Sequence, residues 1–130
     1  MKIIIVLSTL LLSASTLFAE TYYYSFGKKV LLQPLPQSRS VADHTIRYYQ
    51  TPSGVKVGVT DEIIIGCKDI EACKPILEAY PIASVEKLSD SLYLLKLNPG
   101  SDLFKTANAL YHEAPIFLSH PNFIKKRISR

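Results

Sequence analysis

The chain has 130 residues, a net charge of +4, two cysteines and no tryptophan. This length fits one domain. Four C-terminal basic residues carry the excess charge, namely Lys125, Lys126, Arg127 and Arg130. The rest of the chain is nearly neutral, which argues against a nucleic-acid-binding face.

Residues 1–19 are expected to be a secretory signal. Lys2 and the amino terminus precede an apolar stretch, Ile3–Leu12, and a small-residue segment ends at Ala19. A membrane anchor is the alternative, but serines and threonines dilute the segment, which is only just long enough to span a bilayer. We therefore expect cleavage after Ala19, a periplasmic or secreted protein, and no membrane attachment once the signal is removed.

An N-terminal extension over residues 20–45 is expected to start with a β-hairpin. Its arms, Tyr22–Phe26 and Val30–Leu32, flank Gly27, which tolerates the positive φ that such a turn needs. Two prolines follow and are expected to end the second arm. The polar stretch Gln37–Asp43 is then expected to be a linker.

The core domain is expected to span residues 46–123. Ile46–Gln50 and Val55–Val59 flank a turn that contains proline and glycine. Ile63–Ile65 is a β-branched run, which suits a strand with two apolar faces. These segments predict strands.

Two helices follow from apolar spacing and from the positions of proline. Proline is tolerated only in the first turn of a helix, so the first helix cannot begin much before Glu71, and it ends by Tyr80. The second helix is capped by Ser101 or Asp102 and runs to Ala114, where a proline follows.

Three strands alternate with these helices. Ser84–Leu88 and Leu92–Leu97 are expected to form a hairpin, and Ile116–Ser119 the last strand. The resulting order predicts an α+β, ferredoxin-like βαββαβ domain, with a four-stranded antiparallel sheet and two helices on one face. The N-terminal hairpin would precede it.

The strand Leu92–Leu97 is apolar on both faces. Leu92 and Leu94 alternate with Tyr93, Leu95 and Leu97. Because two helices cover only one face of a sheet, the second face needs another cover. The N-terminal hairpin, a second copy of the chain and a partner protein are the candidates.

Cys67 and Cys73 have five residues between them, which matches no zinc or redox motif. In an exported protein a disulfide is favoured, and two small buried thiols are the alternative.

The sequence contains no recognisable catalytic site. Its three histidines lack metal-ligand spacing, no Gly-x-Ser-x-Gly motif occurs, and the glycines are scattered. We therefore expect a protein that is not an enzyme and that needs no cofactor or metal.

Several segments resemble the propeptides of subtilisin-like serine proteases. These are Ile46–Lys68 (IRYYQTPSGVKVGVTDEIIIGCK), Leu88–Leu97 (LSDSLYLLKL) and Ile116–Phe123 (IFLSHPNF), while Tyr22–Leu35 resembles the extension before such propeptides. The resemblance implies a ferredoxin-like module that inhibits a protease catalytic domain and assists its folding. Because no catalytic domain follows in this sequence, we expect a module that acts on a separate protease.

The resemblance also implies two contact regions with the catalytic domain of a subtilisin-like protease. One is the sheet face that bears Leu92 and Leu94, or the opposite face. The other is an extended basic tail, residues 124–130, in the active-site cleft. The tail consists of Ile124, Lys125, Lys126, Arg127, Ile128, Ser129 and Arg130.

Two other functions fit the same residues. In the first alternative, the chain is a non-catalytic remnant of a split protease gene. In the second, it is a periplasmic binding or assembly module whose hairpin and sheet form an oligomer interface. The oligomeric state is left open by the sequence.

Overall fold

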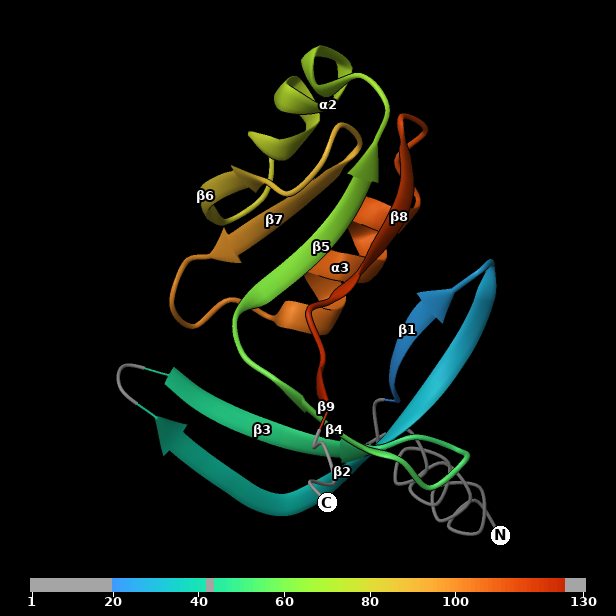
Figure 1. The fold of residues 1–130 in the computed structure, drawn as a ribbon, viewed down its shortest axis with the longest axis vertical. Coiled ribbons are helices and arrows are strands. Elements are labelled where there is room, and N and C mark those ends of the chain that lie inside the picture. Colours follow the sequence, from blue (N-terminus) through green and yellow to red (C-terminus); the bar gives the residue numbers. More distant parts are fainter. Residues whose placement is uncertain (1–19, 42–43, 126–130) are drawn as a thin grey trace, which may run out of the picture.

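The computed structural model describes residues 20–41 and 44–125. These residues fold into two antiparallel sheets and two helices (Figure 1). This confirms the α+β class. The expected signal, residues 1–19, lies outside the described residues. None of the helices within them is long and apolar enough to cross a membrane.

The four-stranded sheet has the strand order β6-β7-β5-β8, and all neighbours are antiparallel. Helix α2 connects β5 to β6, and helix α3 connects β7 to β8, which is the order of a ferredoxin-like βαββαβ unit. The elements are β5 (Glu62–Cys67), α2 (Ile70–Leu77), β6 (Ile82–Lys87), β7 (Leu92–Leu97), α3 (Leu103–Tyr111) and β8 (Ile116–Pro121).

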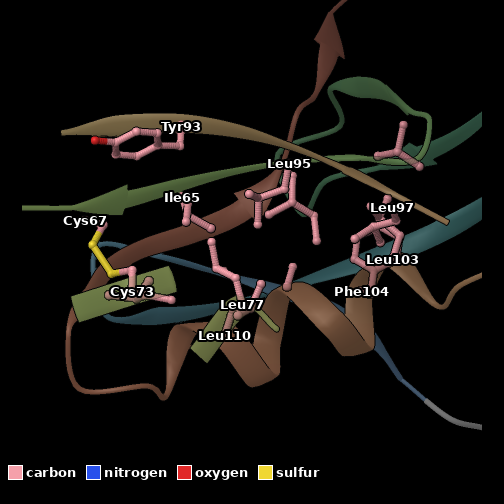
Figure 2. Packing of buried hydrophobic residues seen from close by; sticks show 14 of the residues in the cluster. Ile65, Cys67, Cys73, Leu77, Tyr93, Leu95, Leu97, Leu103, Phe104 and Leu110 are labelled. Carbon is pink, nitrogen blue, oxygen red and sulfur yellow. A yellow bond between two sulfur atoms is a disulfide. The ribbon is translucent and has the colours of Figure 1, made fainter. Parts of the chain in front are cut away.

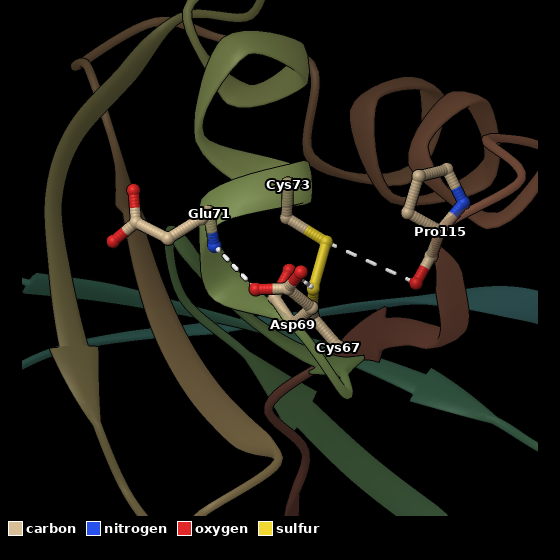
Figure 3. Close-up of a disulfide and its surroundings, with 5 residues drawn as sticks. All are labelled: Cys67, Asp69, Glu71, Cys73 and Pro115. Carbon is tan, nitrogen blue, oxygen red and sulfur yellow. Dashed lines mark hydrogen bonds between the residues drawn. A yellow bond between two sulfur atoms is a disulfide. The ribbon is translucent and has the colours of Figure 1, made fainter.

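Helix α2 starts one residue before the predicted limit. Asp69 caps it by accepting a hydrogen bond from the backbone N–H of Glu71 at 3.1 Å (Figure 3). Pro75 therefore lies beyond the first turn, where its missing N–H removes one helical hydrogen bond. The helix ends soon afterwards, at Leu77, earlier than the predicted limit at Tyr80.

Helix α3 begins as predicted and ends early. Its cap is Asp102, whose Oδ1 accepts from the backbone N–H of Lys105 at 3.1 Å. The helix stops at Tyr111 rather than at Ala114, with His112 as its C-cap. Turns after the helix then carry the chain into β8.

Both helices pack on the same face of the four-stranded sheet (Figure 2). The alternate residues of β7 that point to the helices are buried, whereas on the other face Leu92 and Leu94 are half-buried and Lys96 is exposed. This core contains Ile63, Ile65, Cys67, Cys73, Leu77, Tyr93, Leu95, Leu97, Leu103, Phe104, Ala107 and Leu110. The hydroxyl of Ser119, which is fully buried in this core, donates to the carbonyl of Ala107 at 2.7 Å.

The second sheet has the strand order β1-β2-β3-β4-β9. Its strands are β1 (Thr21–Ser25), β2 (Lys28–Val41), β3 (His44–Gln50), β4 (Lys56–Val59) and β9 (Ile124–Lys125). The predicted N-terminal hairpin is thus confirmed, and so is the hairpin of β3 and β4. The edge-to-face contact of Tyr49 with Phe104, at 5.1 Å between ring centroids, joins this sheet to α3.

The predicted linker is wrong for the part that the structure describes. Strand β2 continues through Pro34 and Pro36 and pairs with β3 from Ser38↔Arg47 to Val41↔His44. The pairing of β2 with β3 shifts register between Pro34 and Ser38, and such an irregularity tolerates the missing N–H of proline. The hairpin is therefore continuous with the second sheet rather than tethered to it.

The N-terminal hairpin packs beside the four-stranded sheet, against α3 and β8 (Figure 1). Tyr24 stacks on Tyr111 with 4.4 Å between ring centroids, and the Asn108 side-chain amide donates to the carbonyl of Tyr22 at 3.0 Å. Tyr23 contacts Phe123 at 4.7 Å. Since these contacts lie on α3 and on the chain after β8, the hairpin does not cover the helix-free face.

Candidate functional site

The helix-free face of the four-stranded sheet carries an apolar row. In β5, Ile63 and Ile65 point to the helices, so Ile64 and Gly66 point away from them. The strand register places Leu94 beside Ile64, and it places Leu92 and Leu118 on either side of Gly66.

We call Ile64, Leu92, Leu94, Phe117 and Leu118 the open face. Four of these side chains are half-buried, and Phe117 is 50% exposed. They come from the three adjacent strands β7, β5 and β8, so they form one continuous patch. Larger apolar patches of this kind are typical of protein-interaction surfaces.

Gly66 leaves room for an aromatic ring on the open face. A Cβ atom at this position would lie 2.6 Å from ring carbons Cε1 and Cζ of Phe117, so the ring lies against the Gly66 backbone. The pairing of β5 with β8 also shifts register between Gly66 and Cys67, and such a bulge redirects a side chain. Glycine is therefore what allows Phe117 to join the patch.

Charged residues border the open face. Glu86 lies opposite Leu94 across the β6–β7 pair, and Lys96 lies opposite Glu62 across the β7–β5 pair. His120 lies beside Ile64 and stacks on Phe123 at 6.2 Å between ring centroids. An apolar centre with a charged border matches the organisation of protein interfaces.

The predicted residues Leu92 and Leu94 both lie on this helix-free face. The opposite face of the sheet, which bears Tyr93, Leu95 and Leu97, is covered by α2 and α3. The open face is therefore the surface that a partner can reach. Phe117 and Leu118, although part of the predicted last strand, were not predicted to belong to the docking face. Their signal was the consecutive apolar run of β8, which exceeds what one buried face requires.

The start of the predicted tail is paired within the protein. Ile124 lies opposite Gly58 and Lys125 opposite Val57, which makes β9 the edge of the second sheet. Asn122 holds the exit from β8, because its backbone N–H donates to the carbonyl of Glu62 at 2.9 Å. The other predicted tail residues, 126–130, lie outside the described part of the chain.

Cys67 and Cys73 form a disulfide (Figure 3), as predicted. It joins the last residue of β5 to α2, and both residues are fully buried. A second link at the same end of the molecule is the hydrogen bond from the Tyr80 hydroxyl to Oε2 of Glu113, at 2.7 Å. This hydrogen bond, together with burial and the glutamate charge, raises the pKa of Tyr80 to about 12.

A cleft of about 700 Å³ lies between β1, β3 and α3. Ser101 and His112 both line it, but they stand at opposite ends of α3, about 16 Å apart along the helix, which is too far for a nucleophile and its base. Among the described residues, no three His, Cys, Asp or Glu side chains converge on a metal site.

No family model, curated protein or solved structure matches the chain.

Proposed function

We propose that this protein is a propeptide-like module that binds the catalytic domain of a subtilisin-like serine protease and inhibits the protease, assists its folding, or does both. The observation that carries this proposal is the open face, a half-exposed apolar patch on a ferredoxin-like sheet. Covering one half-exposed leucine or isoleucine contributes roughly 1 kcal/mol, so a partner that covers the patch gains substantial affinity.

The C-terminal tail then enters the active-site cleft of the protease. Strand β9 holds Ile124 and Lys125 on β4, so the cleft-binding part begins after Lys125 unless β9 detaches. A tail in a cleft binds as an added strand, in which backbone hydrogen bonds supply affinity and side chains supply specificity. This mode of inhibition requires no catalytic group from the module.

The test is an inhibition assay of residues 20–130 against a panel of subtilisin-like proteases, beside a variant that ends at Lys125. We expect competitive inhibition by the longer protein. The shorter one should still bind the protease surface, through the open face, but should lose inhibition. If neither protein binds or inhibits any protease while circular dichroism shows a folded domain, the proposal is wrong.

Leu94→Lys tests the open face itself. Glu86 lies opposite Leu94, so an introduced lysine has a carboxylate neighbour and folding is expected to survive. The matched control is Val85→Lys, because Val85 is 48% exposed on the other face of the same sheet. Leu94→Lys should weaken binding at least tenfold, whereas Val85→Lys should not change it.

A further inference from the structure

The tip of the N-terminal hairpin holds an aromatic residue in an unfavourable conformation. Ser25 pairs with Lys28, which leaves Phe26 and Gly27 as a two-residue turn, and both have positive φ, 50° and 77°. Turns of this type favour Asn-Gly, because asparagine tolerates the left-handed region. A bulky aromatic side chain there is strained.

Phe26 is also almost completely exposed, at 99%. The three tyrosines that precede it on the hairpin are half-buried against the domain, so Phe26 is the exposed residue of this aromatic run. Phenylalanine at this position therefore adds strain and contributes no packing. Neither feature helps the folded protein, which points to a role in binding.

The tip lies near the C-terminal end of α3. A Cβ at Gly27 would lie 3.8 Å from the Tyr111 hydroxyl, and Tyr111 is the last residue of α3. The chain then enters β8, in which Phe117 is the second residue. Figure 1 shows the hairpin beside β8, the edge strand of the four-stranded sheet.

Two exposed lysines, Lys28 and Lys29, follow the tip. Lys29 is already engaged, since its Nζ lies 3.5 Å from Oε2 of Glu20 and 4.1 Å from the ring centroid of Tyr22. Lys28 stands directly beside the turn. A partner surface that receives Phe26 is therefore expected to carry carboxylates at its margin.

We propose that Phe26 is a second anchor for the protein that covers the open face. Its ring inserts into an apolar, acid-rimmed pocket on the surface of the protease, outside the active-site cleft. This inference rests on the proposed function and extends its binding surface past the edge of β8. A protein pocket is favoured over a lipid surface, because one apolar side chain with two lysines gives only weak membrane binding. Buried aromatic anchors, in contrast, dominate many protein interfaces.

The substitution Phe26→Asn separates binding from folding. Asparagine suits the turn, so the variant should melt at a higher temperature than the wild type, yet it should bind a protease from the panel at least tenfold more weakly. The matched control is Leu31→Thr on the same hairpin, where Leu31 is 48% exposed. This control should leave the affinity unchanged.

A charge-reversal variant, Lys28→Glu, tests the rim of the pocket. It should slow association with the protease, and the difference from the wild type should shrink at high salt.

The outcomes separate the two proposals. If the wild type binds a protease and Phe26→Asn binds it equally well, the anchor is wrong and the proposed function stands. If no protease binds, both are wrong. If affinity is unchanged but Phe26→Asn abolishes dimerisation in sedimentation, or binding to vesicles of anionic and zwitterionic phospholipid, the tip serves a different partner and the inference is overturned.

Discussion

Removing the disulfide should destabilise the domain by an amount that the structure allows us to estimate. The bond joins residues with a sequence separation of 6, and a loop of this size restricts the unfolded chain by about 2 kcal/mol. Both cysteines are fully buried, so Cys67→Ala/Cys73→Ala also removes two sulfur atoms from a packed core, at a further cost of about 1 kcal/mol. The expected loss in the free energy of unfolding is about 3 kcal/mol.

The assay is equilibrium unfolding in urea, followed by circular dichroism, for the wild type and the double variant with and without a phosphine reductant. For a domain of this size, about 3 kcal/mol corresponds to a fall in melting temperature of roughly 15 °C. In reductant, the free energy of unfolding of the wild type should fall by the contribution from restricting the unfolded chain, about 2 kcal/mol. The double variant should not respond to reductant.

A difference below about 0.5 kcal/mol would refute this reasoning, since it would mean that the unfolded chain is not restrained by so short a loop. A reductant effect on the double variant would show that the changes seen in the wild type do not come from this bond.

Three further predictions concern packing and titration. The raised pKa of Tyr80 means that its bond to Glu113 is fully present below pH 10 and is lost as the pH rises towards 12. Solvent screens this partly exposed pair, so its contribution to stability is modest. Between pH 10 and pH 12, the free energy of unfolding of the wild type should fall by about 1 kcal/mol more than that of Tyr80→Phe, as measured by unfolding at a series of pH values. Ser119→Ala removes the buried bond to the Ala107 carbonyl and should lower the free energy of unfolding by about 1 kcal/mol in urea titration, and no change would mean that the bond contributes nothing. Gly66→Val should displace the ring that lies on it, lowering both the melting temperature and protease affinity, and unchanged values would show that the ring moves freely.

Local patterns in the sequence were sufficient for much of the ferredoxin-like unit. The apolar spacing of α3 and its Asp102 cap predicted the helix start, because both depend on neighbours within one or two turns. The alternation in β7 separated the buried residues from Leu92 and Leu94 for the same reason. The spacing of the cysteines, together with the expected export, indicated the disulfide.

Contacts between segments that are distant in the sequence decided the rest of the fold, above all strands β2 and β9. The run through Pro34 and Pro36 is polar and proline-rich, so no local signal favours a strand; it becomes one because β3 supplies the hydrogen-bonding partners. Strand β9 exists only because β4 offers a free edge to the chain after β8.

The open face and the hairpin tip depend on the tertiary structure in the same way. A register shift in the β5–β8 pair and the missing side chain of Gly66 bring Phe117 onto the open face. The sequence indicated a turn at Gly27, but only the folded hairpin shows that Phe26 takes positive φ and stands clear of the domain. The sequence by itself determined which residues are apolar and where helices and strands can start, because these properties are local. Which apolar residues remain exposed was decided by strand register and packing, because burial depends on what the rest of the chain places against them.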